Sequence, residues 1–488
     1  MGRSKEQWFV WLLCFAAAAH ILVFSAALPF YNNVDEPYHF DLVVKYSHLR
    51  IPKGPEYFSN ESLQYMAVYS TWEYLYSSDS LSSPPWTQPM SQIAPVLLAR
   101  EKRWHLTNYE SPQPPLYYLV AGAWWNLWAR LGVHDAFLLY MVRFLNVLIV
   151  VTLVWLGWFT ARLVFPEKIF IRIGVAAILA LMPQSIFYSI SNDVLSAVCF
   201  GAVFVCLLKL LRMEILPMNL AIATGLALAA TFLTKNSNLP LLAVSGAVIG
   251  IKIWTLLKQD KLKASLPALG VLFFCAALPM AAWMVWCKIY FGDLLGSNFS
   301  MRSLGWTTKP VSDWWHHPIF SPVGIWTYWM GQLWTLWEGE LMWHGRQFVL
   351  PWSEVIYAII SAALLIAAST ALFPRFSRAT ASQRQSLWLG FACFAASLVF
   401  LAFLSIIYDF HNCIYPSREH PFFHSGRLIL GALIPFVLLI VYGLDRTLDR
   451  FGNAGKFATL AAMMLGMVFV EIFTDWPVFF SQYNWFHI

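Results

Sequence analysis

Long apolar runs recur along this chain of 488 residues, and they limit the folds that it can adopt. A helix needs about 20 apolar residues to cross a bilayer. Apolar residues make up 59% of the sequence and charged residues only 12%, whereas soluble domains carry roughly 25% charged residues. We therefore predict an all-α polytopic membrane protein with about eleven transmembrane helices. The predicted spans cover residues 8–28, 137–160, 171–190, 194–211, 219–234, 239–256, 267–287, 353–373, 386–408, 428–444 and 457–474.

Basic residues between these runs indicate an orientation in the membrane. Lys and Arg gather in short cytoplasmic loops of polytopic proteins. We therefore expect a cytoplasmic N-terminus, and the net charge of +6 needs no nucleic-acid partner to explain it. When the spans are threaded alternately, every inside loop contains Lys or Arg, and these loops are 1–7, 161–170, 212–218, 257–266, 374–385 and 445–456.

The run at residues 114–131, "PPLYYLVAGAWWNLWARL", decides the topology. It is short, rich in aromatic residues and opens with Pro-Pro, and counting it as a span would put every later basic loop outside. We interpret it as a helix that lies along the outer membrane surface. The chain is then a single membrane domain over 1–488, with a first outer loop at 29–136 that contains juxtamembrane helices and a Trp-rich outer loop at 288–352.

Carboxylates at the predicted outer ends of the spans are the first candidates for chemistry. Asp35 is expected to cap a helix that begins near Pro37, where backbone N–H groups and the helix dipole would keep it ionised. Each acid also has a purely structural explanation: Asp35 could cap a helix, Glu110 could lie in an interfacial loop, and Asp193 could belong to a tight turn. The predicted position of all these acids on one side of the membrane favours a functional role. The candidate acids are Asp35 and Glu36 in "NNVDEPYHFD", Glu110 in "NYESPQPPLYYL" and Asp193 in "SISNDVLSAV".

Three motifs, "DEPYHF", "QPPLYY" and "HSGRLILGALIPF", occur in an order that resembles the GT-C glycosyltransferases. These membrane enzymes use lipid-phosphate-linked sugars, and they include protein mannosyltransferases and aminoarabinose transferases. The likeness is greatest to an uncharacterised bacterial branch, and it covers residues 1 to about 240 and the region of Gly426 and Arg427. Leu428 stands where relatives often have Tyr, and Gln113 where many have His or Lys, which leaves the subfamily and the acceptor open.

The resemblance implies a glycosyltransferase that moves a sugar from a polyprenyl-phosphate donor to a hydroxyl of a glycan, lipid or protein. The reaction would take place at the extracytoplasmic face of a bacterial inner membrane. Asp35 would act as general base, and Glu36, Glu110 and Asp193 would position the acceptor or bind a metal. Members of the family differ in their use of metals, so no metal or other cofactor is assigned.

The leaving phosphate of such a donor needs positive charge on the same side of the membrane. Arg427 stands at the mouth of a predicted span, and an arginine there can contact a phosphate with two N–H groups. An equally simple explanation is an arginine that snorkels to the interface. The candidate substrate-binding residues are Arg427, Arg418, His424, Lys235, His39 and Tyr117.

Two other classes of protein fit a chain of this composition, a transporter or flippase of lipid-linked sugars and a noncatalytic scaffold. Transporters usually place ionisable residues near the bilayer midplane, in broken and repeated helices. Here the apolar runs hold few charges, Arg143 being the main exception, and the acids gather at one face. This favours chemistry at the membrane surface, and a scaffold would leave the ordered acidic motifs unexplained.

Overall fold

The computed structural model describes residues 3–71, 83–343, 346–376, 379–413 and 415–488. This part of the chain is a bundle of helices, and its strands form two small antiparallel pairs. The pairs are β1 (Thr307–Thr308) with β4 (Tyr408–Asp409), and β2 (Met342–Trp343) with β3 (Arg346–Gln347).

Nine helices of the described chain are long and apolar enough to cross a membrane. The prediction of an all-α polytopic membrane protein is therefore confirmed. Two further apolar helices, α8 (Ile169–Ala180) and α10 (Met218–Thr234), are shorter, so the count of eleven spans is not confirmed. The nine spans contain α1 (Arg3–Ala27), α7 (Asp135–Val164), α9 (Asp193–Arg212), α11 (Leu239–Lys258), α12 (Leu262–Phe291), α16 (Pro351–Ser369), α17 (Ala381–Ile407), α18 (Leu433–Thr447) and α19 (Asn453–Phe479).

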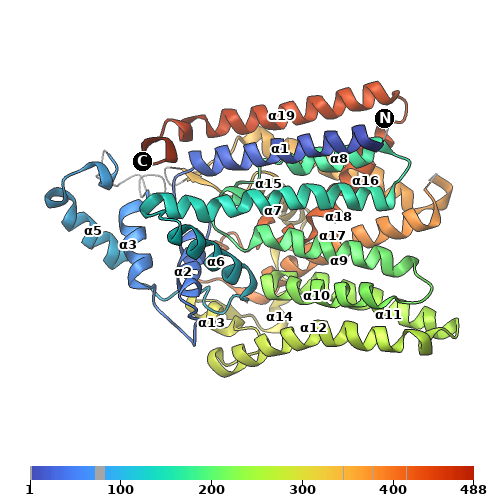
Figure 1. Cartoon of the computed structure of the whole chain (residues 1–488), viewed down its shortest axis with the longest axis horizontal. Coiled ribbons are helices and arrows are strands. Elements are labelled where there is room, and N and C mark those ends of the chain that lie inside the picture. Colours follow the sequence, from blue (N-terminus) through green and yellow to red (C-terminus); the bar gives the residue numbers. More distant parts are fainter. Residues whose placement is uncertain (1–2, 72–82, 344–345, 377–378, 414) are drawn as a thin grey trace.

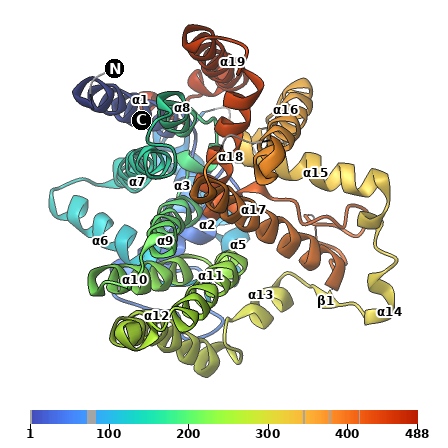
Figure 2. The ribbon, with the colours of Figure 1, turned by 90° about the vertical axis from the view of Figure 1, so that its right-hand side faces the viewer.

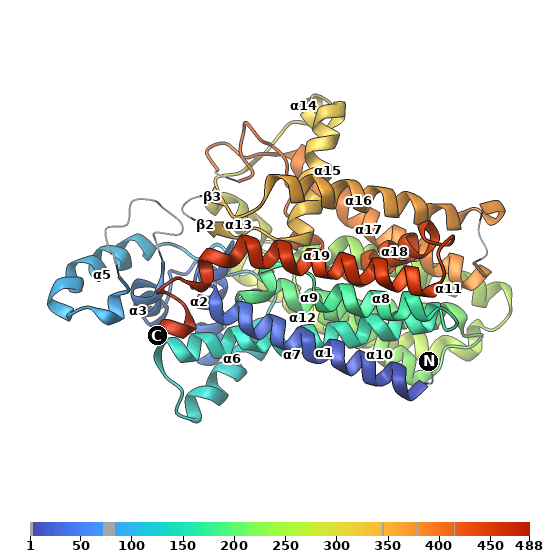
Figure 3. The same cartoon turned by 90° about the horizontal axis from the view of Figure 1, so that it is seen from above.

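The long helices run side by side, and shorter helices gather at one end of the bundle (Figures 1 and 3). The N-terminus of α1 lies at the opposite end, so α1 leads the chain towards the short helices. The short helices at that end are α2 (Glu36–Ser47), α3 (Asn60–Tyr69), α5 (Met90–Trp104) and α6 (Leu116–Arg130). The smaller helices of the Trp-rich segment are α13 (Ser297–Ser303), α14 (Val311–Trp314) and α15 (Pro322–Trp337).

Helix α6 is the run whose interpretation decided the predicted topology. Its 15 residues span roughly 22 Å at 1.5 Å per residue, less than the hydrocarbon core of about 30 Å. It is not among the nine spanning helices of the described chain, and it packs closely on α2, because a Cβ on Gly122 would lie 2.8 Å from the Ser47 nitrogen. Its position along the membrane surface stays a prediction.

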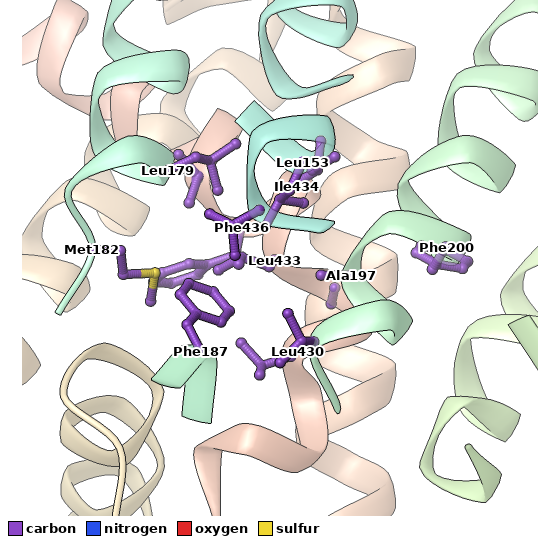
Figure 4. Packing of buried hydrophobic residues seen from close by; sticks show 14 of the residues in the cluster. Leu153, Leu179, Met182, Phe187, Ala197, Phe200, Leu430, Leu433, Ile434 and Phe436 are labelled. Carbon is purple, nitrogen blue, oxygen red and sulfur yellow. The ribbon is translucent and has the colours of Figure 1, made fainter. Parts of the chain in front are cut away.

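Helix α18 forms the centre of the bundle, as the end-on view in Figure 2 shows. It follows the 3-10 turn η7 (Gly426–Ala432), and 94% of the apolar window in this span is buried, against 22% for α19 at the periphery. A helix that is apolar on every side is expected at such a position. Figure 4 shows the packing around it, with Leu153, Leu179, Met182, Phe187, Ala197, Phe200, Leu430, Leu433, Ile434 and Phe436 labelled.

Glycine allows α18 to approach α16 closely. A Cβ on Gly443 would lie 2.0 Å from the Leu364 carbonyl oxygen, whereas a Cβ on Gly250 of α11 would meet nothing within 4 Å. We expect Gly443→Ala to destabilise the protein by about 1–3 kcal/mol through overpacking, and Gly250→Ala to be neutral or stabilising by up to about 1 kcal/mol. Thermal unfolding of the two variants in detergent tests this, and equal midpoints would contradict it.

Candidate functional site

A cavity of about 410 Å³ opens near the end of the bundle where α2 begins. One part of its wall is charged and includes Asp35, Glu110, Lys235, Glu340 and Arg427. The other part is apolar, and it consists mainly of Leu239, Leu295, Met301, Leu304, Phe400, Leu401, Leu404, Phe423 and Leu428. The cavity therefore presents ionic groups beside a surface suited to a hydrocarbon chain.

The backbone at Asp35 turns its side chain towards this cavity. Asp35 precedes the first residue of α2, as expected, but its φ of 63° lies in the left-handed region and its side chain makes no capping hydrogen bond. The expected helix cap is therefore wrong. The carboxylate instead accepts hydrogen bonds from the Tyr109 hydroxyl and the Arg427 guanidinium. Non-glycine residues in this backbone region often mark functional sites.

Three carboxylates from distant segments surround the guanidinium of Arg427, which lies in η7. Its Nη2 donates to Asp35, which follows α1. Its Nη1 lies 3.2 Å from Oδ2 of Asp193, the first residue of α9, and its Nε lies 3.4 Å from Oε2 of Glu340, which follows α15. A planar guanidinium with five N–H donors can contact several carboxylates at once, and Arg427 joins three segments that are far apart in the sequence.

A second cation, Lys235, stands beside this group. It lies between α10 and α11, is buried, and pairs with Asp193. The Ser191 hydroxyl donates to the same carboxylate over 2.9 Å. Asp193 thus connects both cations, although its own side chain does not line the cavity.

The cavity carboxyls differ in their affinity for protons. Burial acts to raise the pKa of Asp35, but Arg427 and other neighbours outweigh it, so this pKa lies below its ordinary value. Burial, and then the charge of Asp35, raise the pKa of Glu110 to about 7. Burial also raises the pKa of Glu340, in spite of Arg427 and a hydrogen bond from Ser425. Of these three carboxyls, Asp35 therefore favours its ionised form most strongly, and the pKa of Glu110 lies near neutral pH.

The raised pKa of Glu110 makes the stability of the protein depend on pH. The folded state binds this proton more tightly than the unfolded chain, whose ordinary value is 4.5, so the stabilisation is complete below pH 4.5 and lost as pH rises through about 7. We expect Glu110→Gln to raise the unfolding midpoint relative to the natural protein more at pH 8 than at pH 5. Thermal unfolding at the two pH values measures this, with Glu214→Gln as control, because Glu214 is exposed and pairs with Lys261. An equal difference at both pH values would contradict the assignment.

Glu36 was expected in the site, but its side chain is bound by a separate set of hydrogen-bond donors. Both carboxylate oxygens pair with Arg143 at 2.8 Å, and the backbone N–H groups of Tyr31 and Ile190 donate to them at 2.8 and 3.0 Å. Both charges are fully buried. This pairing accounts for the arginine inside the second predicted span, and the engaged oxygens of Glu36 leave it no access to the cavity.

Four other expected binding residues also lie outside the cavity wall. His39 is buried against the Tyr118 hydroxyl, 2.7 Å from its Nδ1, and burial, then Lys235, lower its pKa to about 3. Tyr117 is completely buried on α6. Arg418 is exposed and pairs with Asp409 at 3.0 Å. His424 does not line the cavity, but its Nδ1 lies 2.6 Å from the hydroxyl of Tyr415, which does.

Two residues that line the cavity and contact the charged group, Glu340 and Tyr109, were not predicted. Glu340 belongs to the Trp-rich segment, where "WEGELMW" carries no local pattern that separates it from Glu338. Tyr109 directly precedes Glu110 in the segment "NYESPQPPLYYL", so its position beside a candidate acid was the feature that could have identified it. Among the described residues, no group of three or more His, Cys, Asp or Glu is arranged to hold a metal ion, and we assign none.

Comparison with solved structures gives a coarse likeness. No protein-family model matches this sequence, and no curated protein matches it. An oligosaccharyltransferase of Archaeoglobus fulgidus, solved in complex with zinc and sulfate, matches with a TM-score of 0.41 and 10% sequence identity. The match covers 95% of this chain and 53% of that one, so the chain spans about half the length of this neighbour.

Proposed function

We propose that this protein is an integral-membrane glycosyltransferase that moves a sugar from a polyprenyl-phosphate donor to an acceptor hydroxyl. Asp35 is the general base in this proposal. The observation that carries it is the position of a partly exposed carboxylate beside a buried arginine, on the wall of a cavity that is also lined by many apolar side chains. The acceptor is a hydroxyl of a glycan, lipid or protein.

The contacts of Asp35 are compatible with this role. Tyr109 donates to its Oδ1 and Arg427 to its Oδ2. A carboxylate has about four acceptor positions, so each oxygen keeps one lone pair for an incoming hydroxyl. Glu110 has one buried oxygen without a hydrogen-bond partner among the described residues, and it is the candidate for positioning the acceptor.

The proposed reaction is a single displacement at the anomeric carbon. The acceptor oxygen forms a bond to this carbon, its proton passes to Asp35, and the bond to the lipid phosphate breaks with the electrons leaving on the phosphate. Arg427 and Lys235 are the cations on the cavity wall that would receive this charge. The apolar wall would hold the first prenyl units of the donor.

The proposal places the reaction at the extracytoplasmic face, with the N-terminus in the cytoplasm. The basic predicted inside loops support this orientation. A cysteine introduced at Val133, just after α6, tests it with a thiol reagent that does not cross membranes. We expect labelling from the outside in intact cells, whereas labelling only after lysis would reverse the topology from this point on.

The activity is tested in membranes that contain the full chain and a radiolabelled polyprenyl-phosphate sugar. We expect the label to move into a product without the polyprenyl group, and membranes without the protein serve as control. A flippase of lipid-linked sugars, the alternative function, would move the intact donor across the membrane and leave the sugar on its lipid. That result would overturn the proposal.

A further inference from the structure

A second group of carboxylates lies away from the cavity, close to the same end of the bundle. We call Glu338, Glu471 and Asp475 the α19 acidic cluster. Asp475 follows Glu471 by four residues on α19, and both are mostly buried. Glu471 and Glu338 are the charged neighbours of Asp475. Ionisable groups inside a spanning helix are costly to bury, and they usually have a function.

One of these carboxylates, Glu471, has a hydrogen-bond partner at each oxygen. The Nε2 of His20 lies 2.8 Å from Glu471 Oε2, and the Tyr188 hydroxyl donates to the other oxygen. A single imidazole can neutralise at most one carboxylate. The cluster therefore contains more acid than its described partners balance.

The other two carboxylates have unused oxygens. The Ser353 hydroxyl donates to Glu338 Oε1 over 2.7 Å, while the buried Oε2 has no hydrogen-bond partner in the described chain. Asp475 is 8% exposed, and it has no hydrogen bond or ion pair with any described residue. Buried polar atoms in proteins are nearly always satisfied, so Glu338 Oε2 points to a missing donor. The oxygens of Asp475 can accept from the same donor, because no described residue occupies them.

An apolar groove of about 320 Å³ adjoins this cluster. The carboxylates themselves do not line it, but its lining includes Ser353, which donates to Glu338, and Trp337, which precedes Glu338. We call it the α16–α19 groove, and it is lined by Ile178, Trp337, Trp352, Ser353, Ile356, Tyr357, Ile360, Ser361, Leu364, Ile440, Met463, Gly466, Met467, Phe469 and Val470.

The depth of the cluster fits the headgroup region of a bilayer. Asp475 and Glu471 lie four and eight residues before the end of α19, roughly 6 and 12 Å along the helix axis. Trp352 and Trp476 are more than half exposed nearby, and exposed tryptophans of this kind mark the membrane interface.

We propose that the α16–α19 groove and the α19 acidic cluster bind one membrane lipid whose head carries a primary ammonium group, as in phosphatidylethanolamine. The acyl chain lies in the groove, and the ammonium donates N–H groups to Glu338 and Asp475. Hydrogen bonds between charged groups are the strong ones. A quaternary ammonium, as in phosphatidylcholine, has no N–H to donate, so the site distinguishes these two lipids. This site is independent of the proposed transfer reaction.

Native mass spectrometry of the full chain in detergent tests the proposal with phosphatidylethanolamine and phosphatidylcholine of identical acyl chains. We expect the protein to retain phosphatidylethanolamine about tenfold better, the ratio that one charge-assisted hydrogen bond would produce. The double variant Glu338→Gln/Asp475→Asn should lose this preference and bind both lipids equally. Equal retention of both lipids by the natural protein would mean that the carboxylates simply hold protons, and it would overturn the proposal.

A second variant tests the groove without altering the acids. Gly466 lines the groove, and a Cβ there would meet nothing within 4 Å, so Gly466→Leu should fill the groove without strain. We expect this variant to retain at least about tenfold less phosphatidylethanolamine. Gly250→Leu is the matched control, because Gly250 is equally open and lies on α11, outside the groove. Undiminished binding by Gly466→Leu, or an equal loss in the control, would contradict the assignment even if the acidic double variant failed to fold.

Discussion

Asp35→Asn is expected to lower sugar transfer by about 10²–10⁴-fold, the range that a positioned general base contributes. Asn has nearly the shape of Asp, and its amide oxygen can accept from Arg427 while its amide N–H donates to the hydroxyl oxygen of Tyr109, so both neighbours can keep a partner in the variant. What it loses is the charge and the ability to take a proton. The measurement is the initial rate of transfer from the radiolabelled polyprenyl-phosphate sugar, normalised to the amount of folded protein.

The control for this variant is Asp409→Asn. Asp409 pairs with the exposed Arg418 and does not line the cavity, so its neutralisation should leave the transfer rate unchanged. A folded Asp35→Asn protein that transfers sugar at the natural rate would eliminate Asp35 as the base. The chemistry would then have to be assigned to another group on the cavity wall.

Arg427→Lys is expected to reduce both transfer and stability. A lysine ammonium is a compact charge on a flexible stem, and it cannot replace a guanidinium that lies against Asp35, Asp193 and Glu340 together. Breaking a buried ion pair costs about 3–5 kcal/mol. We expect a clearly lowered unfolding midpoint in detergent and transfer reduced by about 10²-fold or more, since each lost charged hydrogen bond is worth about 1.5–3 kcal/mol.

Arg418→Lys is the matched control for this second variant. Arg418 has 65% of its side chain exposed and pairs with one carboxylate, and exposed ion pairs contribute at most about 1 kcal/mol. Its replacement should leave the midpoint and the transfer rate close to the natural values. If Arg427→Lys also left the unfolding midpoint and the transfer rate unchanged, Arg427 would be an ordinary interfacial arginine without a specific role.

The helical membrane fold could be predicted from the sequence because it depends on local composition. Each apolar run contains a helix in the structure, and the two that fall short, α8 and α10, have only 12 and 17 residues. The alternation of loops also predicts that Asp35, Glu110 and Asp193 share one side of the membrane, and this sidedness stays a prediction. The side of the membrane on which a loop lies is predicted from the number of spans before it and from the Lys and Arg residues in the loops, and both can be read from the sequence.

The contacts within the site could not be predicted in the same way. Asp35 and Glu36 are neighbours, yet they point into different surroundings because the positive φ of Asp35 turns its side chain away from the helix. The partner of Glu36 lies 107 residues later, and Arg427 lies 392 residues after Asp35. Such pairings depend on how the spans pack. Glu340 escaped notice for the same reason, because only the packed bundle brings it to Arg427.

The long separation between Asp35 and Arg427 has a consequence for biosynthesis. At about 5–20 residues per second, a ribosome needs about 2–8 s for the 42 residues between Asp193 and Lys235, but about 20–80 s for the 392 between Asp35 and Arg427. The nascent chain therefore holds Asp35 at the membrane edge without its arginine until nearly the whole protein has been made. The charged group around Arg427 is therefore completed late in synthesis. A ribosome that stalls before η7 leaves inserted helices that lack Arg427.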